Sequence, residues 1–327
     1  MGKPEPQLKR TNEILQIPVR VRASPRIINL KFIIMPIIKK NDVTPERPVI
    51  IVLYGTPGTG KTSLATTAEN PLLIDTDRGY DRAVQRCDTL TANKWEDITA
   101  EYETMKSYKT IICDTAKACL DDYLMNFAIK NNYKLANNAL KRFGQMAEDF
   151  KSFVNQLRSN GSDIIFICHD KETVEGDIVK HSPDCTGQSK DLLLRIADQV
   201  GYISKVNGKR TVSFEPTDTF IGKNVAQLQM MEIPESTSAD FSNCMAGIIS
   251  TVKSAIQNKS EEQKKANEML AMLRENLAAA MTDEDIAALI EGMKELPVVL
   301  QYPFFQEMKS NLASKGYKYE NKKFVKE

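Results

Sequence analysis

The chain has 327 residues, of which 42% are hydrophobic and 27% are charged, and its formal net charge is +1. These proportions are typical of a globular protein, and they exclude low-complexity and collagen-like chains. A net charge this close to zero gives no argument for a polyanionic partner of the whole chain, so any basic surface has to be local. The length suits one principal core with additions at either end.

The cysteines and the apolar runs indicate the compartment. Six cysteines are scattered without a Cys-x-x-Cys pair, at positions 87, 113, 119, 168, 185 and 244, which predicts free, mostly buried thiols in a reducing environment. No signal-peptide pattern is present, and no apolar run approaches the ~20 residues that span a bilayer. We therefore expect a cytoplasmic protein without a membrane partner.

Residues 1–47 are rich in proline and are predicted to form an N-terminal arm rather than a domain. One apolar stretch, residues 27–38, predicts a strand that ends near Pro36. Residues 1–40 carry nine basic side chains against two acidic ones. This excess is compatible with a solvated terminus and equally with a segment that binds phosphate groups.

The pattern changes at residue 48, and residues 48–235 are predicted to form an α/β core. Short apolar runs without alternation, at residues 49–54, 72–75, 110–114 and 164–168, are typical of strands buried on both faces of a mainly parallel sheet. The helical pattern of residues 139–157 would cover that sheet. Residues 200–205 and 209–215 flank Asn207-Gly208, which predicts a hairpin.

Residues 236–327 are polar and predict a small helical C-terminal module. A helix is expected over residues 261–281, and Thr282 is a candidate N-cap for a second helix that runs to residue 296. Residues 316–325 alternate aromatic and basic side chains. These aromatics either fill a small hydrophobic core or stack on nucleic-acid bases while the lysines follow the phosphates.

The strongest motif lies between the first core strand and a helical pattern. It is a phosphate-binding loop with the form GxxxxGK[ST], made of Gly55, Thr56, Pro57, Gly58, Thr59, Gly60, Lys61 and Thr62, and followed by Ser63. Its glycines let successive backbone N–H groups point at a phosphate. Lys61 would reach the β- and γ-phosphates of ATP, and the Thr62 hydroxyl would bind Mg²⁺. We expect residues 55–63 to form the nucleotide-binding set.

A second Mg²⁺ anchor is expected at the end of a buried strand, and Asp114 has that position. The alternative is an aspartate that caps the next helix. Because Thr115 follows Asp114, the acidic pair of AAA+ machines is absent, and the base that activates water has to lie elsewhere. This favours a RecA-like core.

Four short motifs follow one another along the chain: the phosphate loop at residues 55–62, Ile-Asp-Thr-Asp at 74–77, Ile-Cys-Asp-Thr at 112–115 and Ile-Cys-His-Asp at 167–170. In this order and spacing they resemble the phage-encoded RecA-like P-loop ATPases, AAA-family ATP-binding proteins of the single-strand annealing or recombinase type. The resemblance covers roughly residues 45–235. It implies that Asp77, just past the second core strand, polarises the attacking water; Asp75 is a nearby rival, and a charged turn after the strand is the structural alternative. It also implies that His169, at the end of another strand, senses the γ-phosphate, the alternative being a structural histidine. The predicted catalytic residues are then Lys61, Asp77, Asp114 and His169.

The same resemblance implies the partners. It suggests ATP-dependent assembly of a homo-oligomer, a ring or a filament, on single-stranded DNA, with annealing or strand exchange and a single-strand-binding protein as a further partner. Residues 170–189 would be a flexible loop ordered by DNA, or an ordinary surface loop. A basic residue of a neighbouring subunit could complete the ATP site, the candidates being Lys205, Lys209, Arg210 and Lys223.

Three other functions fit the same motifs. A RecA-like helicase or helicase loader would share every catalytic residue. A small-molecule P-loop kinase is disfavoured because no arginine-rich lid follows Lys61. The third is a binding module that hydrolyses ATP very slowly. The feature that would indicate it is aspartate at position 77, where the family more often has glutamate.

Overall fold

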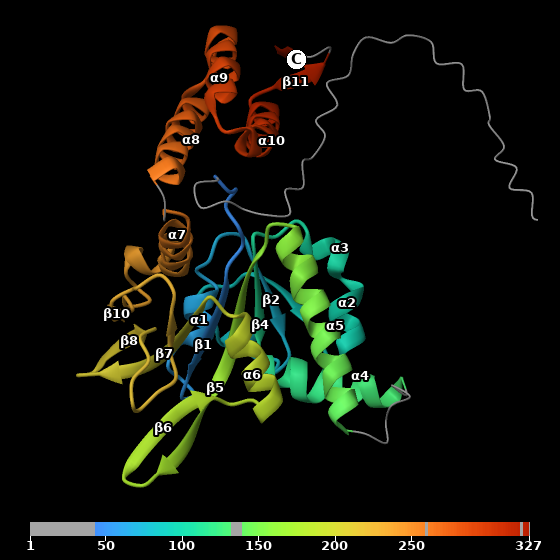
Figure 1. Cartoon of the computed structure of the whole chain (residues 1–327), viewed down its shortest axis with the longest axis vertical. Helices are drawn as coiled ribbons and strands as arrows, with labels where there is room; N and C mark the ends of the chain where they lie inside the picture. The colour runs from blue at the N-terminus through green and yellow to red at the C-terminus, as the bar shows by residue number, and fades with distance from the viewer. Residues whose placement is uncertain (1–42, 132–138, 259–260, 321–322, 327) are drawn as a thin grey trace, which may run out of the picture. The chain divides into compact units, whose positions relative to one another are not determined.

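The computed structural model describes residues 43–131, 139–258, 261–320 and 323–326, and the strand predicted at residues 27–38 lies outside them. The described core is a ten-stranded sheet in the order β10-β8-β7-β1-β5-β4-β2-β3, with β6 paired to β5 and β9 paired to β7 (Figure 1). Its strands are β1 (Ile50–Gly55), β2 (Pro71–Asp75), β3 (Asp88–Thr91), β4 (Thr110–Asp114), β5 (Asp163–Glu175), β6 (Ile178–Pro183), β7 (Gln199–Val206), β8 (Lys209–Ser213), β9 (Lys223–Asn224) and β10 (Met231–Glu232).

The centre of the sheet is parallel and one side of it is antiparallel. Strands β3, β2, β4, β5, β1 and β7 pair in parallel, whereas β8, β9 and β10 add antiparallel pairings beyond β1. The predicted hairpin is confirmed: β7 and β8 meet at Asn207 and Gly208, whose φ angles of 51° and 80° are the left-handed values that this turn dipeptide accommodates. The α/β fold with a mainly parallel sheet is therefore as predicted.

Helices connect the parallel strands, as parallel crossovers require. The connecting helices are α1 (Lys61–Ala65), α2 (Trp95–Ala100), α3 (Tyr102–Met105), α4 (Met125–Lys130), α5 (Ala139–Ser159) and α6 (Gly187–Ile196), with the short helices η1 (Tyr80–Arg82) and η2 (Ala118–Leu124). After the last core strand, the short helix η3 (Ala239–Phe241) and helix α7 (Cys244–Gln257) follow.

Strand β1 shows why the apolar runs do not alternate. Ile50 and Val52 belong to one hydrophobic cluster, with side chains of α5 and α6, whereas Ile51 and Leu53 belong to a second cluster, with side chains of α1 and α7. Both faces of the strand are therefore dry, and each fully buried aliphatic side chain contributes about 1.5–3 kcal/mol of transfer free energy. This burial fixes the end of β1, and hence the loop that follows it.

The second cluster extends past residue 235, where the sequence suggested a domain boundary. Met245 and Val252 of α7 are fully buried in it with Ile51 of β1. The Lys253 ammonium also lies 2.8 Å from the Asp163 carboxylate at the start of β5. Helix α7 thus packs as part of the α/β core, and the exact boundary stays a prediction.

The C-terminal residues have a hydrophobic cluster of their own. It is built by α8 (Glu261–Ala279), α9 (Asp283–Glu295), α10 (Val298–Ser314) and the hairpin of β11 (Tyr317–Glu320) and β12 (Lys323–Lys326). The predicted N-cap is confirmed, since the Thr282 side chain accepts from the Asp285 N–H in a capping box. Phe305, Tyr319 and Phe324 pack on one another with ring centroids 4.9–6.2 Å apart. These contacts favour the hydrophobic-core role of the terminal aromatics.

The cysteines are unpaired, as the sequence predicts. All six cysteines are free, and four of them are buried. Among the helices that the structure describes, none has the length and apolar character needed to cross a bilayer.

Candidate nucleotide site

The phosphate-binding loop leaves the end of β1 and enters α1, as the motif predicts. Gly58 and Gly60 have φ angles of 79° and 84°, a region that L-residues avoid. Gly55 is needed for a different reason, because a Cβ there would lie 2.3 Å from the Ile203 carbonyl oxygen on β7. Thr56 and Pro57 are exposed, whereas the Thr59 hydroxyl donates to the Thr56 carbonyl at 2.9 Å and holds the loop closed.

Lys61 is almost completely buried, with 6% of its surface exposed. Its ammonium donates to the carbonyl oxygens of Gly55 and Thr56, each at 2.9 Å. Burial lowers the pKa of this lysine, and the nearby Asp114 carboxylate opposes the shift. The ammonium is therefore held at the loop by backbone carbonyls that a phosphate can replace.

The predicted magnesium pair is brought together. The Thr62 hydroxyl at the start of α1 donates to Asp114 Oδ2 at 2.6 Å, although β5 lies between β1, which leads into the loop and α1, and β4, which ends at Asp114. Burial raises the pKa of Asp114, while the hydrogen bond from Thr62 opposes the shift. A hydroxyl and a carboxylate are the hard oxygen ligands that Mg²⁺ prefers, so the donor set fits this ion.

The two acidic candidates at the end of β2 differ in their surroundings. Asp75 is 3% exposed, and its oxygens accept from the N–H groups of Asp77 at 3.1 Å and Tyr80 at 2.9 Å. Asp77 is 45% exposed and its Oδ2 lies 3.8 Å from His169 Nε2 at the end of the buried part of β5. Asp75 thus shapes the turn, and Asp77 is the carboxylate that solvent and a substrate can reach.

His169 connects this site to the rest of β5. Its Nδ1 is buried and has no hydrogen-bond partner within the part of the chain that the structure describes. Asp77 lies in the turn after β2 and His169 lies on β5, and the approach of their side chains brings these two predicted residues into one site.

Two polar residues, Thr76 and Ser63, stabilise the backbone around the site. Thr76, which sequence reasoning missed, donates its hydroxyl to the Asp114 carbonyl at 2.9 Å and accepts from the Thr115 N–H at 2.8 Å. Thr76 thus joins the end of β2 to the end of β4. In the sequence, the position of this hydroxyl residue between Asp75 and Asp77 could have indicated its role. Ser63, predicted to bind nucleotide, is buried, and its hydroxyl accepts from the Val84 N–H at 3.2 Å. Its side chain braces the loop.

Three of the four basic residues considered for a neighbouring subunit have partners in their own chain. Arg210 on β8 is 17% exposed in its side chain, and its Nη1 lies 2.8 Å from the position a Cβ on Gly60 would take. Lys209 pairs with Glu232 at 2.8 Å, and Lys223 donates to the Leu194 carbonyl at 3.1 Å; Lys205 is exposed at the end of β7. Arg210 therefore packs against the phosphate loop of its own chain.

The predicted flexible loop at residues 170–189 is wrong. Strand β5 continues to Glu175 and pairs with β6 in a two-stranded hairpin that extends beyond the sheet, and α6 begins at Gly187 (Figure 1). The sequence contained the signal, because Thr-Val-Glu and Ile-Val-Lys flank Gly176-Asp177, and Gly176 has φ 64°. The predicted helix-forming and strand-forming segments elsewhere in the core are as expected.

A protein-family model described as the AAA domain matches residues 47–225, more than half of the chain. The chain therefore belongs to the AAA domain family, and this membership, with the phosphate-binding loop, indicates nucleotide-dependent ATPase activity. No curated protein matches the chain.

Proposed function

We propose that this AAA-domain protein is a Mg²⁺-dependent ATPase that acts on single-stranded DNA and promotes annealing or strand exchange. The observation that carries the ATPase part of the proposal is the approach of Asp77 to His169 beside the phosphate loop. The DNA-directed part extends the resemblance of the motifs in chain order. His169 is followed directly along β5 by the hairpin that extends beyond the sheet (Figure 1). A shift of His169 on loss of the γ-phosphate would therefore pass along β5 to the hairpin.

Each residue of the site has a separate role in ATP hydrolysis. Lys61 exchanges its two carbonyl partners for the β- and γ-phosphates of ATP, and the loop N–H groups bind the same phosphates. Thr62 and Asp114 would hold Mg²⁺, which would neutralise phosphate charge when bound. Asp77 accepts a proton from, or orients, the attacking water, and His169 registers whether the γ-phosphate is present.

The charges of the hairpin limit where DNA can bind. Residues 170–183 carry four carboxylates and two lysines, which disfavours close contact with a phosphate backbone. The basic excess of residues 1–40 and the exposed Lys205 are better sources of phosphate contacts. If the arm supplies them, removing residues 1–40 reduces the slope of log K against log salt by about 0.7 for each phosphate of single-stranded DNA that the arm neutralises.

We further propose that the active form is a homo-oligomer, a ring or a filament, and that a single-strand-binding protein is a partner. Among the basic candidates, Lys205 is the one best suited to reach a neighbour's ATP site, because it is exposed at the β7 end. Sedimentation of the full chain with and without ATP and single-stranded DNA tests this assembly.

Steady-state ATP hydrolysis with and without single-stranded DNA tests the central proposal. We expect stimulation by DNA, complete loss of hydrolysis in Lys61→Ala, and a larger loss of the stimulated rate than of the basal rate in His169→Ala. Lys151→Ala on α5, a partly exposed lysine paired with Glu148, is the matched control and should behave like the wild type.

Hydrolysis that is indifferent to DNA would refute the DNA-directed part of the proposal and favour a small-molecule substrate. Stimulated hydrolysis accompanied by unwinding of duplex DNA, without annealing, would assign the chain to the helicase or helicase-loading class instead.

A further inference from the structure

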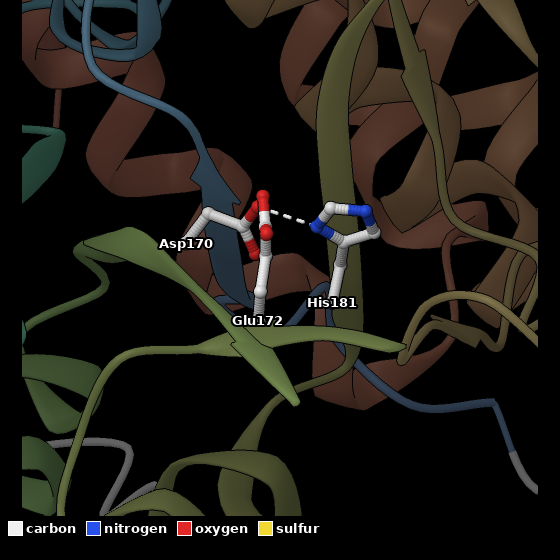
Figure 2. Close-up of side chains that lie close together, drawn as sticks. All are labelled: Asp170, Glu172 and His181. Atoms are coloured by element: carbon white, nitrogen blue, oxygen red, sulfur yellow. Dashed lines mark hydrogen bonds and ion pairs between the residues drawn. The ribbon is translucent and has the colours of Figure 1, made fainter. Parts of the chain in front are cut away.

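Three side chains with metal-binding chemistry meet at the base of the β5–β6 hairpin. Asp170 and Glu172 are two residues apart on β5, so they share one face of the strand, and His181 on β6 pairs directly with Glu172 in the ladder (Figure 2). One ligand atom from each of the three lies within 4.8 Å of the others. The register of the hairpin therefore gathers one imidazole and two carboxylates on a single surface.

The burial of Asp170 is the observation that points to a ligand. Its side chain is 1% exposed, and its Oδ2 lies 2.6 Å from His181 Nδ1. The other oxygen, Oδ1, is buried and has no hydrogen-bond partner within 3.5 Å among the described residues, although the Tyr202 hydroxyl interacts with this carboxylate. An unsatisfied buried carboxylate oxygen is costly, and a cation beside it would remove that cost.

His181 is held in place from several directions. Its ring stacks on Tyr202 with centroids 5.0 Å apart, and its backbone N–H donates to the Thr219 carbonyl at 2.8 Å. Tyr54 donates its hydroxyl to the His181 carbonyl at 3.3 Å and to the Ile221 carbonyl at 2.6 Å. A ring fixed in this way loses little further freedom when a metal binds.

We propose that Asp170, Glu172 and His181 bind one divalent transition-metal ion, Mn²⁺ or Zn²⁺, which ties β6 to β5 at the base of their hairpin. The mixed nitrogen and oxygen donor set favours these ions over Mg²⁺ and Ca²⁺, which take oxygen ligands. Two ligands bound at ~2.1 Å are at most ~4.2 Å apart, so the set has to close slightly. Glu172 is exposed and can make that adjustment.

The best probe is Mn²⁺, because two other groups compete for Zn²⁺ or Mg²⁺. The Cys168 and Cys185 thiols are buried with their sulfurs 4.0 Å apart, and soft thiolates select Zn²⁺. The oxygen ligands Thr62 and Asp114 belong to the nucleotide site. Binding is therefore measured on the full chain without nucleotide, in excess Mg²⁺, by the loss of the electron paramagnetic resonance signal of free Mn²⁺.

We expect one Mn²⁺ per chain, and at least tenfold weaker binding in His181→Gln and in Glu172→Gln, since losing even an outer-shell partner of a metal ligand weakens metal binding about 10- to 100-fold. Glu175→Gln is the control, because it removes the same charge from the same hairpin at a residue that pairs with Lys180 instead. Thermal denaturation gives a second readout, with Mn²⁺ raising the midpoint of the wild type and of Glu175→Gln but not of His181→Gln.

Absence of saturable binding near one ion per chain would overturn the proposal, as would equal affinity in all three variants. Because Glu172 is exposed, Glu172→Gln remains informative even if His181→Gln does not fold.

Discussion

Alanine substitution of the two left-handed glycines of the phosphate loop separates backbone strain from the contact with Arg210. Gly58 and Gly60 have similar φ angles, 79° and 84°, but a Cβ at Gly58 would meet nothing within 4 Å, whereas one at Gly60 would lie 2.8 Å from Arg210 Nη1. Left-handed strain costs an L-residue about 1–2 kcal/mol, and the reduced entropy of the unfolded chain offsets about 0.4–1 kcal/mol of it. Gly58→Ala should therefore destabilise by about 1 kcal/mol.

Gly60→Ala should cost more, because Arg210 has to move. The guanidinium donates to the Pro234 carbonyl at 3.3 Å and lies over the Phe241 ring at 6.0 Å. Breaking these two interactions adds about 1–2 kcal/mol, for a total of about 2–3 kcal/mol. At ~2–4 °C per kcal/mol for a domain of this size, the midpoint should fall by roughly 2–4 °C in Gly58→Ala and by roughly 4–12 °C in Gly60→Ala.

The assay is thermal denaturation of the nucleotide-free protein, followed by circular dichroism, so that phosphate binding does not contribute. Arg210→Ala and the double variant Gly60→Ala/Arg210→Ala complete the cycle. We expect the double variant to lose less stability than the sum of its single changes, because both remove the same interactions. Equal effects of Gly58→Ala and Gly60→Ala, or strict additivity in the cycle, would refute the reasoning.

Three further predictions concern other parts of the molecule. Burial raises the pKa of Asp114 in the folded protein above its pKa in the unfolded chain. The contribution of Asp114 to stability is therefore present below the unfolded-state pKa and is lost as the pH rises through the folded-state pKa. Asp114→Asn should thus stabilise the nucleotide-free protein at pH 7, with a gain that disappears in acid, and it should remove Mg²⁺-dependent hydrolysis. An unchanged midpoint at pH 7 would contradict this. Asp77→Asn should lower kcat by about 10²- to 10⁴-fold with little effect on stability, whereas Asp75→Asn should destabilise the fold, because Asp75 accepts two backbone N–H groups; similar kinetics in both would remove the assignment of Asp77. Deleting residues 316–327 should lower the thermal midpoint, since Tyr317 is buried, and leave the salt dependence of DNA binding unchanged; a weaker salt dependence would instead indicate nucleic-acid contacts.

The predictions that succeeded rest on local patterns. The strand runs of the core, the Asn207-Gly208 turn and the Thr282 cap each depend on residues within a few positions of one another. The flexible loop at residues 170–189 failed because its polar composition outweighed a weaker hairpin signal. The β-branched pairs Thr173-Val174 and Ile178-Val179, on either side of Gly176-Asp177, lie in the paired ends of β5 and β6.

The candidate site divides in the same way. Sequence reasoning identified Lys61, Thr62 and Asp114 one at a time, and parallel strands bring such strand-end residues to one edge of a sheet. It could not choose between Asp75 and Asp77, because the choice depends on which carboxylate accepts the backbone hydrogen bonds of the turn. It considered Arg210 for a neighbouring subunit, whereas the β7–β8 hairpin returns this side chain to the phosphate loop.

By itself, the sequence determined that this chain has a phosphate-binding loop in an α/β core, because glycine spacing and unbroken apolar runs are constraints that act within a few residues. Only the tertiary structure decided that Asp77 meets His169, that Arg210 contacts Gly60, and that Asp170, Glu172 and His181 converge. These pairs are set by strand order and hairpin register, which depend on how distant segments share the burial of one sheet.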